Sequence, residues 1–421
     1  MTTVVLVGTL DTKGAEIEYV RTRLHELGAD VLVVDGGVMD HSAGRADVSA
    51  DEVAAAGGGK RADLAAARDR SAAMAAMRAG VLAIVTDLHR HGRLDGILAV
   101  GGSGGAALAA AAMQALPVGV PKLIVSTMAA GDTRPYVGES DIAMLYPVVD
   151  IAGLNRLSRQ VLGNAAAAMA GMVQAAGRAR TGATDKAGDE RPLIGATMFG
   201  VTTPCVTAAR ERLEALGYEV LVFHATGTGG RAMEGLVRSG FLAGVLDVTT
   251  TELADELVGG VLSAGPERLT AAGELGIPQV VSLGALDMVN FGPPDTVPAR
   301  FRGRRLYEHN ASVTLMRTSV EECRELGRIV ARKLNAATGP TSLFIPRGGV
   351  SMIDVPGGAF HDPAADGALF DALLADLDPR VEVVDLPVDI NDPSFGPAMA
   401  DRLDAMVRRS RPGEPAASGA R

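Results

Sequence analysis

The sequence predicts an α/β protein with two Rossmann-like, doubly wound domains whose sheets are mainly parallel. Short β-branched runs alternate with helical patterns rich in Ala, Leu, Arg and Glu from the first residues onward. The predicted strands are apolar throughout, which is typical of parallel sheets that helices cover on both faces. The alternation stops once, at the polar stretch 177–192, and then begins again, so the same architecture is expected twice.

The first half of the chain contains four predicted strands and three predicted helices. Each strand is a short run such as VVLV or KLIVS, and each helix is rich in Ala, Leu and charged residues. The strands are expected at 4–7, 31–34, 95–100 and 122–126, and the helices at 14–27, 104–115 and 153–176.

The second half repeats this alternation after the polar stretch. Runs such as EVLVF, QVVSL and SLFIP indicate buried parallel strands, with helical patterns between them. The strands are expected at 192–198, 219–223, 243–248, 279–283, 342–346 and 381–386, and the helices at 204–216, 231–238, 251–262, 319–336 and 394–409.

These patterns divide the chain of 421 residues into two domains, which is an ordinary number for this length. We expect a nucleotide-binding Rossmann-like domain at 1–178, a linker at 179–191 and a second Rossmann-like domain at 192–410. The end of the chain, 411–421, is rich in Pro, Gly, Ala and Arg and has no core to join, so it is expected to be disordered.

Charge and composition argue against several classes of protein. The formal charge of -10 and the 3% content of aromatic residues disfavour a nucleic-acid-binding protein, which usually carries a basic face. Two cysteines, Cys205 and Cys323, cannot form a disulfide framework and fit a reducing compartment. No signal peptide and no uncharged apolar run of about 18 residues stands out. We therefore expect a cytoplasmic protein without a nucleic-acid partner and without a membrane span.

The first candidate loop, GTLDTKG, leaves the first predicted strand and opens a helix. In open parallel sheets ligands bind beyond the carboxyl ends of the strands, and N–H groups at a helix start attract anions. The glycine spacing is not that of a Walker A loop, and the acid that ends the next strand occupies the place of a ribose ligand in dinucleotide folds. An ordinary capped helix is the alternative. The cofactor-binding residues expected here are Gly8, Thr9, Asp11, Thr12, Lys13 and Asp35.

The second candidate loop, GGSGG, follows the strand ILAV and precedes an Ala-rich helix. Four glycines in five residues cost chain entropy and allow a phosphate or ribose to approach the main chain. The spacing fits a dinucleotide fingerprint, but no acid ends the following strand, so the nicotinamide version is incomplete. The alternative is a tight turn packed against small side chains. The residues expected to bind the cofactor are Gly101, Gly102, Ser103, Gly104 and Gly105.

The third candidate loop, STMAAGD, follows the strand KLIVS. The run 127–152 has little periodicity, and a long ordered loop in a compact domain is often functional. A solvated connection is the alternative. The cofactor-binding residues expected here are Ser126, Thr127, Gly131 and Asp132.

Longer motifs run through both halves in the order GTLDTKG, DGGV, GGSGGAALA, VPKLIVSTMAAGD, YVGESDI, DIAGLNRLSR, LIGATMFGVTTPCV, VFHATGTGGRAME, DVTTTELADELVGG, GALDMVNFG, PRGGVS and INDP. Together they resemble a family of bacterial and plant proteins that includes the tomato mosaic virus resistance protein. The resemblance spans about residues 3–405 and implies two Rossmann-like domains, with ATP bound by the first. ATP, with or without Mg²⁺, is therefore the expected cofactor.

The second half has its own polar loops. The loop HATGTGG follows a predicted strand and opens a helix, a geometry that favours anions, and two further polar loops follow neighbouring strands. We expect these loops to face one small anionic metabolite, and the alternative is that they only cap helices. The substrate-binding residues expected here are His224, Thr226, Gly227, Thr228, Gly229, Thr250, Asp287 and Asn290.

The second half also contains residues that could support a thiol nucleophile or a metal site. Cys205 opens a predicted helix, where a thiolate would be stabilised, but it also fits a small buried filler. The histidines lack the spacing of a metal site, so no metal is expected.

The function that these features favour is ATP binding, coupled to acting on or sensing a small anionic metabolite in an interdomain cleft. The alternative is a nucleotide-regulated protein-binding module without turnover. A nicotinamide-dependent oxidoreductase fits less well because its fingerprint is incomplete. We also expect a homodimer, for which the Ala-rich stretch 153–176 is one candidate packing face.

Overall fold

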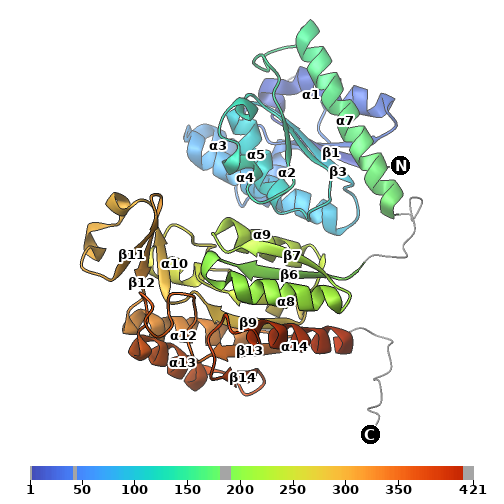
Figure 1. The fold of residues 1–421 in the computed structure, drawn as a ribbon. Coiled ribbons are helices and arrows are strands. Elements are labelled where there is room, and N and C mark those ends of the chain that lie inside the picture. The colour runs from blue at the N-terminus through green and yellow to red at the C-terminus, as the bar shows by residue number, and fades with distance from the viewer. Residues whose placement is uncertain (1, 41–44, 181–190, 411–421) are drawn as a thin grey trace. The chain divides into compact units, whose positions relative to one another are not determined.

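The computed structural model describes residues 2–40, 45–180 and 191–410 and forms two compact units, Met1–Asp189 and Glu190–Arg421 (Figure 1). The last helix of the first unit continues to Arg180, so the first two residues of the expected linker are helical. The rest of that linker up to 190 and the expected tail, 411–421, lie outside the described residues.

The N-terminal unit is built on one five-stranded sheet in the order β2-β1-β3-β4-β5, and every adjacent pair is parallel. The strand order reverses between β1 and β3, as in doubly wound folds. The strands are β1 (Thr3–Gly8), β2 (Asp30–Asp35), β3 (Gly96–Val100), β4 (Lys122–Val125) and β5 (Ala143–Leu145).

Helices cover both faces of this sheet. Alternate residues of β1 enter opposite cores: Val4 and Leu6 pack with α1 and α7, whereas Val5 and Val7 pack with α2, α4 and α5. The helices are α1 (Leu10–Glu26), α2 (Ala50–Ala56), α3 (Arg61–Ala67), α4 (Arg70–Arg90), α5 (Ser103–Gln114), α6 (Arg134–Val137) and α7 (Arg156–Arg180). The predicted Rossmann-like fold is therefore confirmed, although the sequence did not predict α2, α3 or α4. A long loop was expected at 127–152, where the structure has α6 and β5.

Among the described residues, the long helix α4 alone has the length and hydropathy of a membrane span. No span was expected from the sequence. In the structure α4 contributes Met77, Val81 and Val85 to the core beneath the sheet. A core helix of a folded domain meets the same length and composition criteria, so α4 is weak evidence for a membrane.

The C-terminal unit contains a second parallel sheet, with six strands in the order β14-β13-β9-β8-β6-β7. Its order again reverses beside the first strand, between β6 and β8. The strands are β6 (Leu193–Met198), β7 (Glu219–His224), β8 (Leu242–Thr249), β9 (Gln279–Gly284), β13 (Thr341–Pro346) and β14 (Glu382–Leu386).

Two helix layers enclose this second sheet. Helices α8 and α14 pack on one face of the sheet. The other face has two hydrophobic cores. One is formed with α9 and α11, and the other with α10, α12 and α13. The helices are α8 (Thr203–Ala215), α9 (Thr228–Arg238), α10 (Glu252–Val258), α11 (Ala271–Leu275), α12 (Val320–Asn335), α13 (Pro363–Asp376) and α14 (Phe395–Ser410).

A small antiparallel sheet, which the sequence did not predict, lies between β9 and β13 in the chain. Its order is β10-β12-β11, with β10 at Met288–Phe291, β11 at Leu306–Asn310 and β12 at Val313–Arg317. The residues of β10 were expected to belong to a polar loop after the strand QVVSL, but β10 is fully buried, and β12 is almost fully buried. The hairpin of β11 and β12 extends beyond the parallel sheet (Figure 1).

Candidate ligand-binding site

A pocket of about 660 Å³ opens at the switch point of the N-terminal sheet. The loop after β1 and the loop after β3 both line it, because the strand order reverses between these two strands. Open α/β sheets bind ligands at this position, and the volume lies in the range of small-molecule sites. Two of the three predicted cofactor loops thus meet in one cavity.

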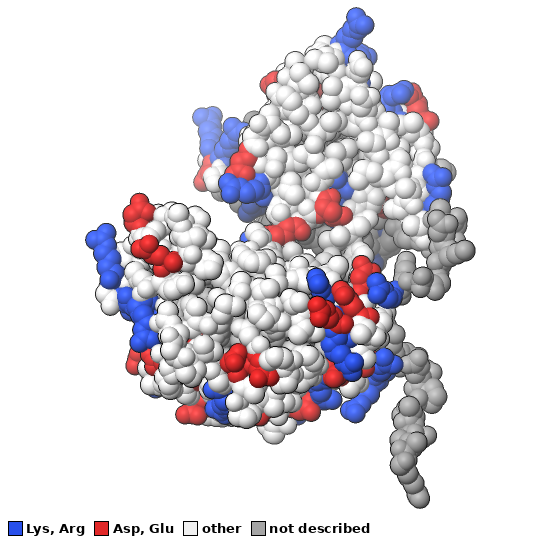
Figure 2. Space-filling view, viewed as in Figure 1, with Lys and Arg blue, Asp and Glu red and all other residues white. Residues whose placement is uncertain are grey.

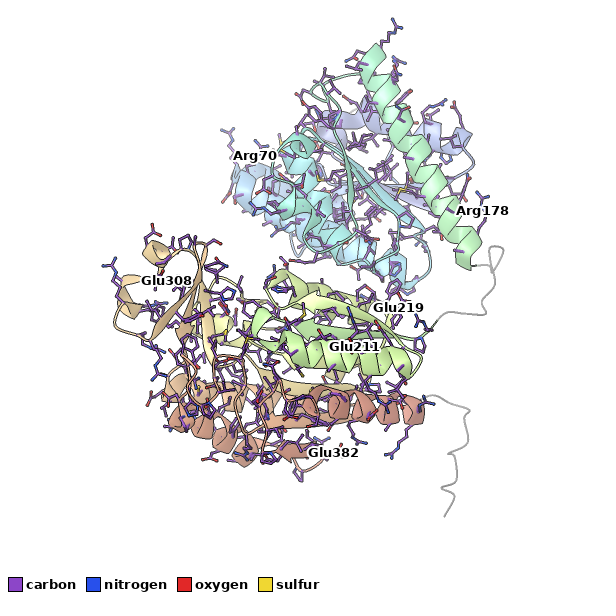
Figure 3. All side chains as sticks on the ribbon, viewed as in Figure 1. Arg70, Arg178, Glu211, Glu219, Glu308 and Glu382 are labelled. Atoms are coloured by element: carbon purple, nitrogen blue, oxygen red, sulfur yellow. The ribbon has the colours of Figure 1, made fainter. Side chains whose placement is uncertain are left out.

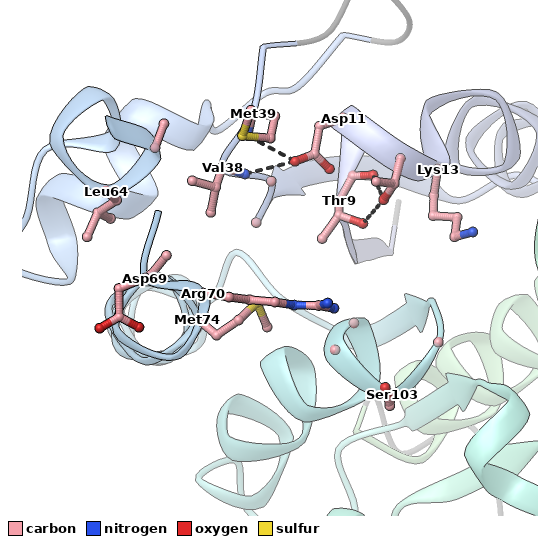
Figure 4. Close-up of a pocket in the computed structure, with 18 of the residues that line it drawn as sticks. Thr9, Asp11, Lys13, Val38, Met39, Leu64, Asp69, Arg70, Met74 and Ser103 are labelled. Atoms are coloured by element: carbon pink, nitrogen blue, oxygen red, sulfur yellow. Dashed lines mark hydrogen bonds between the residues drawn. The ribbon is translucent and has the colours of Figure 1, made fainter. Parts of the chain in front are cut away.

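The pocket has an apolar part and a polar part (Figure 4). In this view Val38, Met39 and Leu64 lie toward one end, and Thr9 and Ser103 lie toward the other. The apolar lining residues are Val38, Met39, Leu64, Ala65, Ala73 and Met74. The polar and glycine residues of the lining are Thr9, Asp11, Thr12, Lys13, Gly36, Gly37, Arg68, Asp69, Arg70, Gly102, Ser103, Gly104 and Gly105.

The glycines of the GGSGG loop leave space that the fold does not use. A Cβ built on Gly102 would meet nothing within 4 Å, and one on Gly104 would meet only the flexible end of Met74 at 3.7 Å. A Cβ on Gly105 would make an ordinary contact of 3.6 Å with a carbonyl oxygen, and none of the three has a positive φ. Packing and backbone strain therefore do not explain these glycines, whereas the close approach of a ligand would.

Gly101, in contrast, is explained by the fold alone. A Cβ at this position would lie 3.0 Å from the Cα of Gly105, tighter than side chains usually tolerate. The alternative considered from the sequence, a tight turn packed against small side chains, therefore explains Gly101. It does not explain Gly102, Gly104 or Gly105.

The N-terminus of α5 points its free N–H groups at this space. The first N–H that bonds back is that of Ala106, which donates to the carbonyl of Gly102 at 2.9 Å. No side chain caps the helix, and Ser103 is exposed. The N–H groups of Ser103, Gly104 and Gly105 therefore form an uncapped helix start, which is a favourable position for a phosphate.

Arg70 adds a positive charge to the pocket that was not predicted from the sequence. Its side chain extends across the pocket, and the guanidinium points away from the apolar end (Figure 4). In the parts of the chain that the structure describes, no hydrogen bond or ion pair engages it. Arg68, whose φ is 54°, also lines the cavity. Both residues lie at the junction between α3 and α4. No strand or helix was predicted in this region, and the junction does not directly follow a strand.

The two carboxylates expected to bind a ligand near the first predicted loop, Asp11 and Asp35, instead accept hydrogen bonds from main-chain N–H groups. Asp35 is buried and accepts hydrogen bonds from Leu10 N (3.0 Å) and Gly37 N (2.8 Å), so it joins the two loops instead of presenting a free carboxylate to a ribose. Asp11 Oδ2 accepts from Val38 N and Met39 N, both at 3.0 Å. The other oxygen of Asp11 is buried without a hydrogen-bond partner and belongs to a residue that lines the pocket.

The other residues of this loop differ in whether their side chains are directed toward the pocket. Lys13 donates to the carbonyl of Ile151, so in this structure its ammonium is directed away from the polar end of the pocket (Figure 4). Thr9 and Thr12 bond to each other at 2.7 Å and line the cavity. Gly8 ends β1, and a Cβ there would collide with Ile17.

The third predicted loop does not reach the pocket, because none of its residues lines the cavity. Ser126 is fully buried, and its hydroxyl accepts from Met128 N. Thr127 and Gly131 begin and follow a short 3-10 turn. Asp132 is paired with Arg134 at 2.8 Å, and this guanidinium lowers the pKa of Asp132 to about 2. The loop therefore has a local capping role in this structure.

In the C-terminal unit, a carboxylate of the protein occupies the loop that was predicted to bind an external anion. Glu252 Oε1 accepts hydrogen bonds from Gly227 N at 2.7 Å and Gly230 N at 3.1 Å. A Cβ on Gly227, Gly229 or Gly230 would collide with protein atoms, at 2.7, 2.0 and 2.2 Å respectively. These glycines are required by the fold, so the alternative reading of a capped helix describes this loop.

The remaining side chains of this loop make local contacts. His224 packs its ring against Phe199 at a centroid distance of 5.4 Å. Thr226 donates to the carbonyl of His224, and Thr228 is the first residue of α9.

Glu252 belongs to a buried ionic cluster centred on Arg268. Arg268 is 1% exposed; it bonds to Glu252 at 2.6 Å and also pairs with Asp247. Glu234 lies 3.6 Å from the same guanidinium, and burial raises the pKa of Glu234. Thr197 donates to Asp247 at 2.7 Å. One cation thus holds three carboxylates beneath the loop that was predicted to bind an external anion.

Three further predicted substrate residues are buried and face protein atoms. Thr250 donates to the carbonyl of Ser282, Asp287 accepts from Ser351 at 2.8 Å, and Asn290 donates to Asp255 at 2.6 Å. All three predicted residues are 0% exposed, and Asn290 belongs to strand β10 rather than to a loop. In this structure none of them is accessible to a ligand, which corrects the expectation that they face one.

The burial of Asp255 beside Asn290 should make the stability of the C-terminal unit depend on pH. Burial raises the pKa of Asp255 from 3.8 to about 7, although the bonds from Asn290 oppose this shift. The folded unit then keeps a proton that the unfolded chain releases, so this contribution to stability is present at low pH and is lost as pH rises from about 4 to about 7.

We therefore expect Asp255→Asn, which keeps a neutral side chain at all pH values, to flatten the pH dependence of unfolding. Urea denaturation between pH 5 and pH 8 measures this, and Asp401→Asn, at an exposed pair with Arg212, is the control. An Asp255→Asn variant with an unchanged pH profile would contradict the assignment.

Cys205 is not an activated nucleophile. It is 1% exposed at the start of α8, where Asn391 Oδ1 accepts from its N–H at 3.3 Å. Burial, assisted by the nearby Asp389 carboxylate, raises the pKa of the thiol to about 12. The buried-filler reading is therefore the correct one. No group of three or more His, Cys, Asp or Glu side chains is placed to hold a metal within the described ranges.

Comparison with known proteins identifies relatives of both units. Models of the uncharacterised protein family UPF0261 match residues 2–178 with its N-terminal domain and 191–407 with its C-terminal domain. A UPF0261 protein of Clostridium tetani is 52% identical over 407 residues, covering 96% of this chain and 99% of that protein. The tomato ToMV resistance protein Tm-1(GCR237) is 46% identical over 344 residues, covering 81% of this chain but 45% of the tomato protein.

Solved structures add little to this comparison. A putative UDP-N-acetylglucosamine 2-epimerase from Listeria monocytogenes is 11% identical with a TM-score of 0.23, over 66% of this chain and 78% of that chain, which carries no argument about function. The sequence relationship is decisive, because it covers both units. The chain belongs to the UPF0261 family.

Proposed function

We propose that the N-terminal unit binds ATP, or a closely related adenine nucleotide, in the pocket between the loops after β1 and β3. The observation that carries the proposal is the unused space at Gly102, Gly104 and Gly105 in front of an uncapped helix. A fold without a ligand gains nothing from three such glycines, and a phosphate requires close approach to their N–H groups.

The two ends of the pocket fit the two ends of a nucleotide. The start of α5 offers N–H groups and the Ser103 hydroxyl, and Arg70 offers a guanidinium, which together suit phosphate oxygens. The end of the pocket near Val38, Met39 and Leu64 is apolar and suits a planar base.

The consequence of nucleotide binding is also a proposal. Action on a small anionic metabolite, or sensing of one, requires a further site, and the loop 224–230 no longer supports that site because Glu252 fills it. Binding without turnover, with a protein as the output, remains the second candidate. Its support is the 46% identity to a tomato protein whose name describes virus resistance.

The decisive experiment is calorimetric titration of the full chain with ATP and with ADP, with and without Mg²⁺. Heat of binding that saturates supports the proposal, and the absence of binding by both nucleotides overturns it. Chromatography of the same mixtures separates the two outputs: ADP or a modified metabolite means turnover, whereas intact ATP means binding alone.

Arg70 provides a second test of the phosphate position. We expect Arg70→Ala to weaken nucleotide binding by about 1.5 to 3 kcal/mol, the value of a charge-assisted hydrogen bond. Arg78→Ala is the matched control, because Arg78 is exposed on the same helix and does not line the pocket. Equal affinities for the two variants would remove Arg70 from the site.

A further inference from the structure

The segment between α2 and α4 forms one wall of the pocket but adds almost nothing to the core. No residue from 55 to 72 is buried, and α3 lies in the middle of this stretch. Within it, only Leu64 packs partly against the core beneath the sheet. Leu64, Ala65 and Arg68 nevertheless line the pocket. A wall that the core does not use can move while the rest of the unit stays folded.

This segment lies at the outer margin of the N-terminal unit. Figures 1 and 3 place α3 and Arg70 there, and Figure 2 shows basic and acidic side chains gathered at the same margin beside a mostly uncharged surface. Six of the eleven residues at 60–70 are charged. Charged side chains of this kind favour contact with water, so the stretch has little reason to pack more deeply.

Three glycines precede α3, and the fold requires only the first two. A Cβ on Gly57 would lie 2.1 Å from the carbonyl oxygen of Ala76, so Gly57 allows α2 and α4 to approach closely. Gly58 has a φ of 82°. A Cβ on Gly59 would make only ordinary contacts, the nearest at 3.6 Å, and its φ is not positive. Neither packing nor strain explains Gly59, whereas rotation of α3 about this point would.

The other end of α3 is a second point at which the chain bends. Arg68 caps the helix in the left-handed conformation, with φ 54° and ψ 18°. This conformation is uncommon for a residue other than glycine and recurs at ligand clamps and switch regions. The next residue, Asp69, starts α4 by accepting a hydrogen bond from Ala72 N at 3.0 Å. The start of α4 is therefore fixed independently of α3.

One side chain holds α3 in its present position. Arg61 donates to Asp40 Oδ1 at 2.8 Å and to the carbonyl of Val38 at 3.2 Å, both after β2, and to Asp51 Oδ1 of α2 at 2.9 Å. The side chains of Asp40 and Asp51 are 93% and 70% exposed, and ion pairs this open to water contribute little stability. Water can therefore replace the contacts that keep α3 in place.

The apolar end of the pocket lies between α3 and the loop after β2. Val38, Met39 and Leu64 line it, and Met39 is 60% exposed. A base bound between these side chains would remove them from water and add contacts to both walls. We propose that residues 58–68 form a lid that opens about Gly59 and Arg68 to admit the nucleotide and closes over its base, with Arg61 as the latch. This inference rests on the proposed function and adds that the base, not the phosphates, holds the lid shut.

Replacing α3 tests the lid separately from the phosphate end. The seven residues Arg61–Ala67 are exchanged for alternating Gly and Ser in the full chain, which keeps Arg68 and Arg70 at the pocket. Calorimetry then uses two probes, ATP and inorganic tripolyphosphate, which has no base. We expect ATP to bind about tenfold more weakly or worse, the equivalent of one leucine side chain left exposed. Tripolyphosphate should bind as it does to the unmodified chain, and the melting temperature should not change because α3 buries no residue.

Each other result has a definite meaning. Unchanged ATP affinity overturns the lid, and so does an equal loss of ATP and tripolyphosphate, because α3 would then act on the phosphates. A lower melting temperature shows that α3 belongs to the fold and also overturns it. If the unmodified chain binds neither probe, the proposed function fails and the lid fails with it. If that chain binds ATP but the replacement makes no difference, only the lid fails.

Hydrogen exchange of the unmodified chain gives a readout that needs no replacement. The N–H of Leu64 donates to the carbonyl of Lys60 at 3.1 Å and reports on α3. We expect peptides from 58–68 to exchange fast in the empty protein, to slow when ATP saturates the pocket, and to stay fast with tripolyphosphate. Exchange that ATP leaves unchanged while calorimetry shows it bound overturns the lid.

The latch is tested by the rate at which nucleotide leaves. Arg61→Ala removes three bonds that hold the closed position, so ATP should dissociate several-fold faster in stopped-flow measurements while tripolyphosphate dissociates at the unmodified rate. Arg78→Ala, an exposed arginine of α4 outside the pocket, is the control. Equal ATP dissociation rates for the two variants overturn the role of Arg61.

Discussion

Replacing Arg268 by alanine is expected to unfold the C-terminal unit, or to bring it close to unfolding. The guanidinium is fully buried and holds Asp247, Glu252 and Glu234. Removing one partner of a buried ion pair costs about 3 to 5 kcal/mol, because the other charge is left buried and unpaired. Here three carboxylates would be left, and the total stability of a domain is about 5 to 15 kcal/mol.

Thermal and urea denaturation measure this effect, with Arg212→Ala as the control. Arg212 is an arginine of α8 whose pair with Asp401, at 2.6 Å, is exposed, so its loss should cost about 1 kcal/mol or less. Arg268→Lys should rescue little, since an ammonium cannot reproduce the two-sided guanidinium geometry. If Arg268→Ala melts as the wild type does, the cluster does not stabilise the fold.

The same cluster explains why a motif in the sequence was mistaken for a ligand site. The run HATGTGG has the glycines and helix start of an anion loop, and that local geometry is present. The anion, however, is Glu252, which lies 25 residues after Gly227 and is carried by the next strand–helix unit. Local spacing predicts that a loop will attract a carboxylate, but it cannot say whether that carboxylate belongs to the chain.

The parallel strands were predictable for the opposite reason. Buried strands such as VVLV and QVVSL are apolar throughout, and this property does not depend on distant partners. The strands β10 and β12 are equally buried, but they belong to a small sheet whose pairing is set by contacts between separate segments. The residues Arg68 and Arg70 were missed because their helix junction reaches the pocket only through the packing of α4 on the sheet.

Substitutions in the GGSGG loop of the N-terminal unit should change nucleotide affinity without lowering the stability of the fold. We expect Gly104→Ala to leave the stability unchanged or to raise it by up to about 1 kcal/mol, because alanine is the better residue in a helix and meets only the end of Met74. The same methyl group would enter the space ahead of α5, so nucleotide binding should weaken. Gly104→Val should weaken it further, by about a hundredfold or more, or about 2.7 kcal/mol.

Gly171→Ala and Gly171→Val on α7 are the matched controls for this series. Gly171 is also helical, and a Cβ there would meet nothing within 4 Å, but it does not line the pocket. Both positions should therefore respond alike in melting temperature, while only the variants at 104 lose affinity in calorimetry. If Gly104→Val binds nucleotide as tightly as the wild type, the phosphates do not lie at the start of α5. If both Gly104 variants lose stability instead, the glycine serves the fold, and the observation that carries the proposed function is withdrawn.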